Sequence, residues 1–404
     1  RYGPAVRFFQ AVIWLGFLLS MLAVMLWTSA VFLNTVLGMP SQAAIWLTVF
    51  VVGIYTILGG LAAVVVTDAM QMVIMFIGAG ALLGLSFWEI GGWSNMVQTI
   101  SAMGPQFEQH FNLLISSQID TPYPWSGMLM GLGIVLSTAY FSSNQAVIQR
   151  VLGARSEWDA KASMILAAFL KLLIPVLVLL PGLAALALYP ELENPDEAVP
   201  KLVRELLPPG LAGLVFAAFF AALMSSVDSY LNSATTIIIS DGYKPASRAL
   251  IGADPDDRKL LILSRVLTGL LIVAAGFLAP FIDQFETIYT AMQTLFSLFQ
   301  GPTLAVLVLG VFWRRANAWG GFAGLLLGVL CSGSLSLVGE LLFPSDDPFL
   351  YVAFWAFVFS LIVTVVVSLL TPPPSKNQIR GLVFGEVVRD EATQTLLKER
   401  IQSD

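Results

Sequence analysis

The sequence predicts an all-α protein that crosses a membrane many times, and its composition and apolar pattern lead to this fold class. Of the 404 residues, 57% are hydrophobic and 11% are Asp, Glu, Lys or Arg, whereas roughly a quarter of the residues are charged in a soluble domain. These charges are too few to cover a water-exposed surface, so lipid must be the solvent for much of the chain. The apolar runs are continuous rather than alternating, which excludes a transmembrane β-barrel.

Ten runs are long enough to cross a hydrocarbon core, which requires roughly 20 apolar residues of helix. They lie near residues 8–33, 43–66, 68–88, 127–149, 161–189, 210–240, 260–281, 287–312, 319–341 and 350–371. The second and third are nearly fused, because residues 43–88 form one run of 46. At about 1.5 Å per residue this is twice the length of one crossing. We therefore expect the chain to turn near Gly59-Gly60 or near Thr67-Asp68.

The positions of the basic residues predict the orientation of these spans. With the N-terminus in the cytoplasm, 17 of the 20 Lys and Arg residues fall on the cytoplasmic side, as the positive-inside rule requires. A count of nine or eleven spans would scramble this asymmetry. The polar tail at residues 372–404 is then cytoplasmic and too small to be a catalytic domain. Because the chain starts at Arg1 with no signal peptide, we expect it to be part of a longer protein.

Composition also excludes several functional classes. One Cys and one His cannot form a zinc, haem or iron-sulfur site built on those ligands. A net charge of −6 provides no basic surface for nucleic acid.

Three ionisable residues lie well within predicted spans: Asp68, Lys171 and Asp228. Each costs on the order of 3 kcal/mol at membrane depth, so each is a functional candidate. Lys171 either extends toward the nearer interface or, as we favour, faces a polar cavity. Asp68 follows Thr67, and the pair could cap a helix, a role that is compatible with ion binding.

Asp228 belongs to the most polar stretch within a span. At 100° per residue one face of this stretch carries small and hydroxyl side chains, and Asp228 and Asn232 flank it. The residues on that face are Ala222, Ser225, Ser226, Ser229 and Ser233. Hydroxyls, free backbone carbonyls and a carboxylate are the oxygen ligands that a transporter offers to Na⁺. Close helix packing is the alternative explanation for the serines, but it does not explain Asp228.

Helix-breaking residues interrupt several spans, at Gly59-Gly60, Pro175, Pro181-Gly182 and Gly301-Pro302. In lipid, broken helices persist where protein or a water-filled cavity satisfies the freed backbone groups, and they mark transporter sites. We therefore expect discontinuous helices near these positions.

Four ordered motifs resemble the sodium:solute symporters, the family of the sodium/glucose cotransporters. The first is Tyr55-Thr-Ile-Leu-Gly59-Gly60-Leu61-Ala-Ala63 followed by Thr67-Asp68-Ala-Met-Gln71. The others are Asn144-Gln145-Ala-Val-Ile-Gln149-Arg150-Val-Leu, then Leu170-Lys171-Leu with Pro181-Gly182, and Ser225-Ser226 with Leu231-Asn232-Ser233. The similarity runs from residue 1 to about residue 385.

The resemblance implies a leucine-transporter-type fold of two inverted five-helix repeats with two extra C-terminal helices. It implies Na⁺-coupled uptake by alternating access, in a multi-pass protein of the cell membrane. On this reading the first span is the third core helix. The first two core helices, which complete the sodium and substrate sites, are missing, and this chain alone is not expected to transport.

The resemblance also implies roles for individual residues. Sodium ligands from the eighth core helix match Ala222, Ser225 and Ser226. A second sodium site, present in some members, falls at or beside Asp68, Asp228 and Ser229, and Asp228 stands where sugar-transporting relatives often have a neutral residue. Substrate-pocket positions match Ser137, Lys171 and Gln293, and the aromatic inner gate matches Tyr140. Lys171 and Gln293 could bind the hydroxyls of a sugar or polyol, but Lys171 could equally pair with an organic acid such as sialic acid.

Other functions compete with this one. Two intramembrane aspartates also suggest an aspartyl protease, but the Gly-x-Gly-Asp and Tyr-Asp contexts of that class are absent around Asp68 and Asp228. No repeated filter segment indicates a channel. A membrane sensor on the same fold is the remaining alternative, although the short tail offers no output domain. The sequence thus predicts a Na⁺-coupled symporter of a small polar solute, not an enzyme, and leaves its oligomeric state open.

Overall fold

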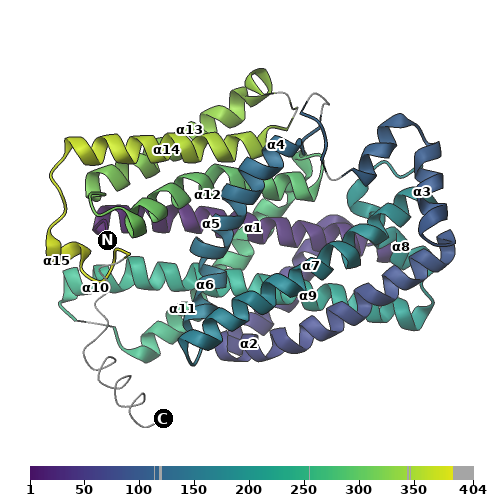
Figure 1. Cartoon of the computed structure of the whole chain (residues 1–404). Helices are drawn as coiled ribbons and strands as arrows, with labels where there is room; N and C mark the ends of the chain where they lie inside the picture. Colours follow the sequence, from purple (N-terminus) through teal and green to yellow (C-terminus); the bar gives the residue numbers. More distant parts are fainter. Residues whose placement is uncertain (113, 118–120, 254, 344, 346, 385–404) are drawn as a thin grey trace, which may run out of the picture. The chain divides into compact units, whose positions relative to one another are not determined.

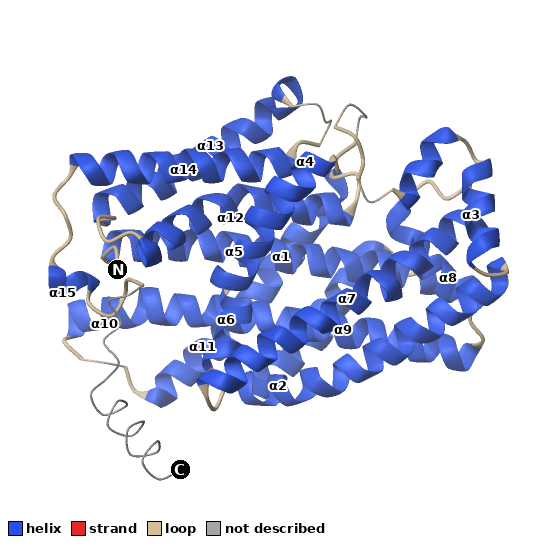
Figure 2. Cartoon of the chain, viewed as in Figure 1, coloured by secondary structure: helices blue, strands red, loops and turns tan. Residues whose placement is uncertain are grey.

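The computed structural model describes the chain except for residues 113, 118–120, 254, 344, 346 and 385–404. The side chains of residues 59–66, 105, 106, 251 and 340 are also not described. The described residues form helices and loops without a strand (Figure 2). Ten helical segments among them are long and apolar enough to cross a membrane. The predicted all-α, ten-span fold is confirmed, whereas most of the predicted tail lies outside the described residues.

The chain divides into two compact units, whose helices carry the labels of Figure 1. Unit 1 comprises residues 1–13, 117–143 and 296–404. Its helices are the start of α1 (Pro4–Leu37), α4 (Trp125–Gly127), the π-helix η2 (Met128–Leu136), α5 (Ser137–Ser143), the end of α12 (Ile288–Phe312), α13 (Ala318–Leu342), α14 (Phe349–Leu370) and α15 (Lys376–Ile379).

Small residues bring α13 and α14 of unit 1 into close contact. Three glycines, one per turn of α13, face three hydroxyl residues, one per turn of α14. The pairs are Gly320 with Ser368, Gly324 with Thr364 and Gly328 with Ser360. A Cβ atom on Gly328 would lie 2.9 Å from the Ser360 Cβ, closer than packed carbon atoms allow. Small residues at helix contacts are how membrane helices approach without a hydrophobic driving force between them.

Unit 2 comprises residues 14–116 and 144–295. It holds the rest of α1, α2 (Ser41–Ile90), α3 (Trp93–Ala102), η1 (Pro105–Phe111), α6 (Gln145–Leu152), α7 (Glu157–Leu188), η3 (Pro195–Glu197), α8 (Ala198–Leu206), α9 (Pro209–Ile237), η4 (Ile238–Tyr243), α10 (Lys244–Ile251), α11 (Asp257–Leu278), η5 (Ala279–Gln284) and the start of α12. Part of its core is aromatic, with Phe32 of α1 stacked on Phe219 of α9 at 3.9 Å between ring centroids. α9 also packs along α2.

Helix α2 contains the turn that the sequence predicts between two spans. It is helical through 50 residues, but the Tyr55 Oη and the Thr67 Oγ1 lie 2.7 Å apart. Twelve residues of a straight helix rise about 18 Å, so the chain must change direction between these two residues. The Gly59-Gly60 side of the predicted turn falls where side chains are not described.

The predicted interruptions at the other helix breakers are wrong. Helix α7 continues through Pro175 and Pro181-Gly182, and α12 continues through Gly301-Pro302. Proline removes one backbone donor and kinks a helix, yet in a membrane the helix persists because lipid offers no other partner for the remaining backbone groups. The observed break is elsewhere, at Asn144, where the run predicted at 127–149 divides into α5 and α6. There the Asn144 side chain accepts a hydrogen bond from the Ala146 amide at 3.0 Å and caps α6.

Candidate functional site

The serine stripe of α9 contains hydroxyls of two kinds. The Ser229 hydroxyl donates to the Ser225 carbonyl at 2.5 Å, and the Ser233 hydroxyl donates to the Ser229 carbonyl at 2.7 Å. These two serines satisfy themselves within their own helix, as the packing explanation expects. The half-buried hydroxyls of Ser225 and Ser226 make no hydrogen bond within the described part of the chain, so they are available to a ligand.

Asp228 is buried within unit 2. Its side chain is 1% exposed, and one carboxylate oxygen accepts a hydrogen bond from the Thr56 hydroxyl of α2. A buried carboxylate requires a partner of this kind because burial alone strongly disfavours its charge. Asp228 thereby connects α9 to the first half of α2.

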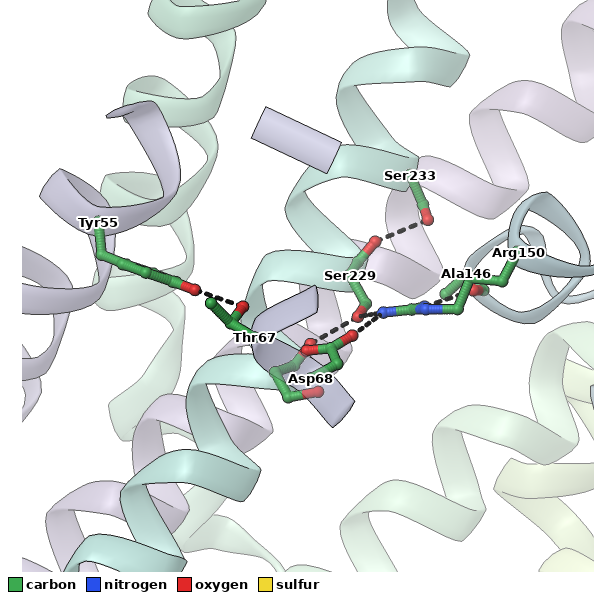
Figure 3. Close-up of polar contacts among 8 residues, drawn as sticks. Tyr55, Thr67, Asp68, Ala146, Arg150, Ser229 and Ser233 are labelled. Atoms are coloured by element: carbon green, nitrogen blue, oxygen red, sulfur yellow. Dashed lines mark hydrogen bonds and ion pairs between the residues drawn. The ribbon is translucent and has the colours of Figure 1, made fainter. Parts of the chain in front are cut away.

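Arg150 connects the second half of α2 to the same turn of α9 (Figure 3). Its Nη2 donates to the Asp68 Oδ2 at 2.6 Å and to the Ser229 Oγ. Its Nη1 donates to the Ala146 carbonyl at 2.7 Å, one turn earlier on α6. Arg150 reaches this position because α6 restarts after the break at Asn144. Asp68 lies inside α2 and forms an ion pair with Arg150, so it is not a helix cap.

Several polar atoms near this cluster are buried without a hydrogen-bond partner. Among the described residues of unit 2, they include the Asp68 Oδ1, the Gln71 Oε1, the Gln149 Nε2 and the Asn232 Nδ2. Buried polar groups are normally paired, and an unpaired one costs free energy. These atoms can therefore form hydrogen bonds to a ligand or to water.

The predicted substrate residues divide between the two units. Ser137 and Tyr140 belong to unit 1, where the Tyr140 ring packs at 6.0 Å from the Phe296 ring. Lys171 and Gln293 belong to unit 2. Lys171 is exposed on α7, whereas Gln293 of α12 is 4% exposed.

One polar atom of the Gln293 amide makes a hydrogen bond, and the other does not. Its Nε2 donates to the Tyr289 hydroxyl at 2.6 Å, and its Oε1 is buried without a partner. It therefore offers an acceptor to a hydroxyl-bearing ligand.

Sequence reasoning missed the direct roles of Arg150, Thr56 and Asn144. The positive-inside rule treats Arg150 only as a cytoplasmic charge, and nothing in the apolar pattern marks Thr56 or Asn144 as a candidate. All three lie in the motifs that carry the family resemblance, and this was the signal that could have found them.

Comparison with known proteins assigns the chain to a family. The chain matches the sequence model of the sodium:solute symporter family over residues 1–328. It belongs to this family. The matched range includes the second half of α2, α6 and the polar turn of α9, which are joined by the contacts of Arg150 with Asp68 and Ser229.

Two curated relatives are myo-inositol cotransporters. The chain is 32% identical to the sodium/myo-inositol cotransporter 2 of Oryctolagus cuniculus, and the match covers 95% of the chain and 62% of the relative. It is 31% identical to the sodium/myo-inositol cotransporter of Homo sapiens, with coverage of 93% and 59%. The chain thus spans about three-fifths of the length of these relatives.

One solved structure shares the fold. It is the substrate-bound outward-open state of a Na⁺-coupled sialic acid symporter, with a TM-score of 0.72 and 22% sequence identity. The match covers 93% of this chain and 76% of that one. The likeness confirms the predicted transporter-type fold.

Proposed function

We propose that the full-length protein is a Na⁺-coupled symporter of a small polar solute, working by alternating access in the cell membrane. The observation that carries the proposal is that the hydroxyls of Ser225 and Ser226 make no hydrogen bond among the described residues, whereas the next serines of α9 bond to their own helix. Na⁺ prefers oxygen ligands of this kind. Family membership supports transport over enzymatic activity.

In this proposal, residues of α9 contribute to two Na⁺ sites. The first uses the Ala222 carbonyl and the hydroxyls of Ser225 and Ser226. The second uses Asp68, Asp228 and Ser229, which the Arg150 and Thr56 contacts gather around one turn of α9. Carboxylates near a cation site balance its charge in a low-dielectric interior.

A sugar or polyol is the favoured solute. Its proposed contacts are Lys171 and Gln293 in unit 2 and, proposed separately, Ser137 and Tyr140 in unit 1. The unpaired Gln293 Oε1 suits a hydroxyl donor, and the two curated relatives are named as myo-inositol cotransporters. An organic acid such as sialic acid is the second candidate, favoured by the positive charge of Lys171. The sensor alternative finds no support among these relatives.

The test is a ligand screen on the full-length protein by thermal stability. Ligands raise the unfolding temperature of the state that binds them, so myo-inositol should stabilise the protein more in NaCl than in choline chloride. Stabilisation by sialic acid alone would move the substrate to organic acids. Equal stabilisation in both salts for every solute would reject Na⁺ coupling.

A variant extends the screen to the solute pocket. Gln293→Leu removes the amide oxygen at similar volume, so it should abolish the solute effect and keep the stabilisation by Na⁺ alone. A variant that still responds fully to myo-inositol would remove Gln293 from the proposed pocket.

A further inference from the structure

Gln300 of α12 is a buried amide that makes no hydrogen bond. Its side chain is 1% exposed, and both its Oε1 and its Nε2 are without a partner within the described part of unit 1. Each unpaired buried polar atom lowers the stability of the folded state, and an apolar side chain at this place would avoid that cost. Two such atoms on one side chain point to a partner that is bound at another step of the protein's cycle.

Helix geometry places Gln300 between two contacts that α12 makes inside unit 1. At 3.6 residues per turn, Gln300 lies between the directions of Thr303 and Leu304. Thr303 accepts a hydrogen bond from the Gln10 amide of α1 at 3.1 Å. Leu304 packs in an apolar cluster that includes Ala139 of α5. Gln300 therefore lies on the side of α12 where α5 and the start of α1 pack.

An aromatic pair lies one turn before Gln300 along α12. The rings of Tyr140 and Phe296 are 6.0 Å apart, and Tyr140 is one of the proposed solute contacts. The helix rises about 6 Å between Phe296 and Gln300. Because α12 runs toward Arg314 and Arg315, which the positive-inside rule assigns to the cytoplasm, Gln300 lies on the cytoplasmic side of this pair. A solute that passes Tyr140 on its way inward meets Gln300 next.

Movement of α5, rather than of α12, gives access to Gln300. Gly301 packs directly against α14, because a Cβ atom there would lie 2.6 Å from the Ala353 carbonyl oxygen. Helix α12 is therefore held against α14 next to Gln300. Helix α5, by contrast, has only seven residues and ends at Ser143, so it can turn as a unit and carry the Tyr140 ring with it.

The amide of Gln300 matches neighbouring hydroxyls. One hydroxyl donates to the Oε1, and a second hydroxyl accepts from the Nε2. A carboxylate only accepts hydrogen bonds, so it would leave the Oε1 unpaired. A polyhydroxylated solute is therefore the ligand class that satisfies both atoms.

We propose that Gln300 is a hydroxyl-binding residue of the exit path, which holds a sugar or polyol on the cytoplasmic side of Tyr140 once that ring has moved aside. This inference rests on the proposed function. In the described conformation the Gln300 amide is closed off and unpaired, whereas in the inward-open state the solute pairs it. A ligand that pairs the amide in one state shifts the population toward that state.

The experiment compares the affinity for solute at the two sides of the membrane. The full-length protein, reconstituted in one orientation, exchanges labelled myo-inositol at equal Na⁺ concentrations on both sides. Gln300→Met keeps the side-chain length and removes the amide. The half-saturating myo-inositol concentration at the cytoplasmic side should rise roughly five- to thirtyfold, as expected for loss of two hydrogen bonds. The value at the external side should change by less than about twofold, because solute entering there first meets contacts before Tyr140.

A stability measurement and a matched variant separate a solute contact from a structural residue. Without solute, Gln300→Met removes two unpaired buried atoms, so the unfolding temperature should rise. Gln10→Met removes an amide that already bonds to Thr303, so it should lower the unfolding temperature and keep the ratio of the two half-saturating concentrations.

The outcomes separate this inference from the proposed function. An unchanged ratio in Gln300→Met would overturn the inference alone. A lower unfolding temperature of this variant without solute, or its failure to fold, would also overturn it, because the amide would then have a structural partner. Absence of Na⁺-dependent myo-inositol exchange by the natural protein would overturn the proposed sugar or polyol transport together with the inference.

Discussion

Ser226 and Ser233 lie seven residues apart on α9, and their hydroxyls differ in what they do. The Ser233 hydroxyl is bonded to its own helix at 2.7 Å, whereas the Ser226 hydroxyl is free of such a bond within the described residues. The stripe could be predicted from periodicity, but this difference could not, because it depends on a rotamer choice at each serine.

The two serines provide a matched pair of substitutions. Ser226→Ala should raise the Na⁺ concentration for half-maximal uptake roughly tenfold, because losing one hydroxyl contact to a charge costs about 1.5 kcal/mol. Ser233→Ala should leave this concentration unchanged. Initial uptake rates across a Na⁺ series measure both, and equal effects from the two variants would make the whole stripe a packing feature.

The charged residues were only partly predictable. Asp68 and Asp228 stand out because an ionisable group in an apolar run is costly. Arg150 does not stand out, because it follows the apolar run and its position predicts an ordinary cytoplasmic base. Its contact with Asp68 joins residues 82 apart, which no local pattern encodes.

At the scale of helices, α13 and α14 show how small residues position the C-terminal part of unit 1. A Cβ atom on Gly324 would lie 3.0 Å from the Ser360 carbonyl oxygen and would meet Thr364, whereas a Cβ atom on Gly333 would meet nothing within 4 Å. The two glycines lie on the same helix, so they separate packing from helix propensity.

Gly324→Val should therefore lower the free energy of unfolding by about 1–3 kcal/mol, the usual cost of overpacking. Gly333→Ala should be neutral or stabilising by up to about 1 kcal/mol, because alanine is the better helix former. Thermal unfolding in detergent measures both changes. Tolerance of Gly324→Val would mean that α13 and α14 do not approach as closely as the structure shows.

The start of α12 depends on a distant carboxylate. The half-buried Asp196 of η3 accepts a hydrogen bond from the Ile288 amide at 2.8 Å. Burial raises the pKa of the Asp196 carboxyl, and the bond from Ile288 partly opposes this rise. The folded protein consequently holds this proton to higher pH than the unfolded chain does.

This shift predicts a pH dependence with a definite sign. The contribution of Asp196 to stability should be largest below its usual pKa of about 4 and should fall as the pH rises through its folded pKa. Asp196→Asn retains an acceptor for Ile288 but does not titrate, so the natural protein should lose unfolding temperature relative to the variant between acidic and neutral pH. A difference that stays constant with pH would contradict this.

Helix positions were predicted more reliably than helix breaks. Apolar length fixes the crossings because each needs a minimum run of residues. Breaks were assigned to prolines, yet α7 and α12 absorb their prolines, and the break occurs at Asn144. An asparagine side chain can cap a new helix, but composition alone does not show which asparagine does so.

For the molecule as a whole, the family and its fold were predictable because the motifs recur in order along the chain. The grouping of the predicted solute contacts could not be predicted from the sequence. Ser137 and Tyr140 belong to one unit, and Lys171 and Gln293 belong to the other. The ion candidates of unit 2 are connected by direct contacts through Arg150 and Thr56.

The proposed function requires that a Na⁺ gradient drive solute uptake. Its most direct test is the initial rate of myo-inositol uptake by the full-length protein in sealed vesicles, measured with an inward Na⁺ gradient and with choline in place of Na⁺. Na⁺ coupling predicts rapid accumulation above the external concentration with Na⁺ and slow equilibration without it. Equal rates and no accumulation in the two conditions, for myo-inositol and for sialic acid alike, would contradict it.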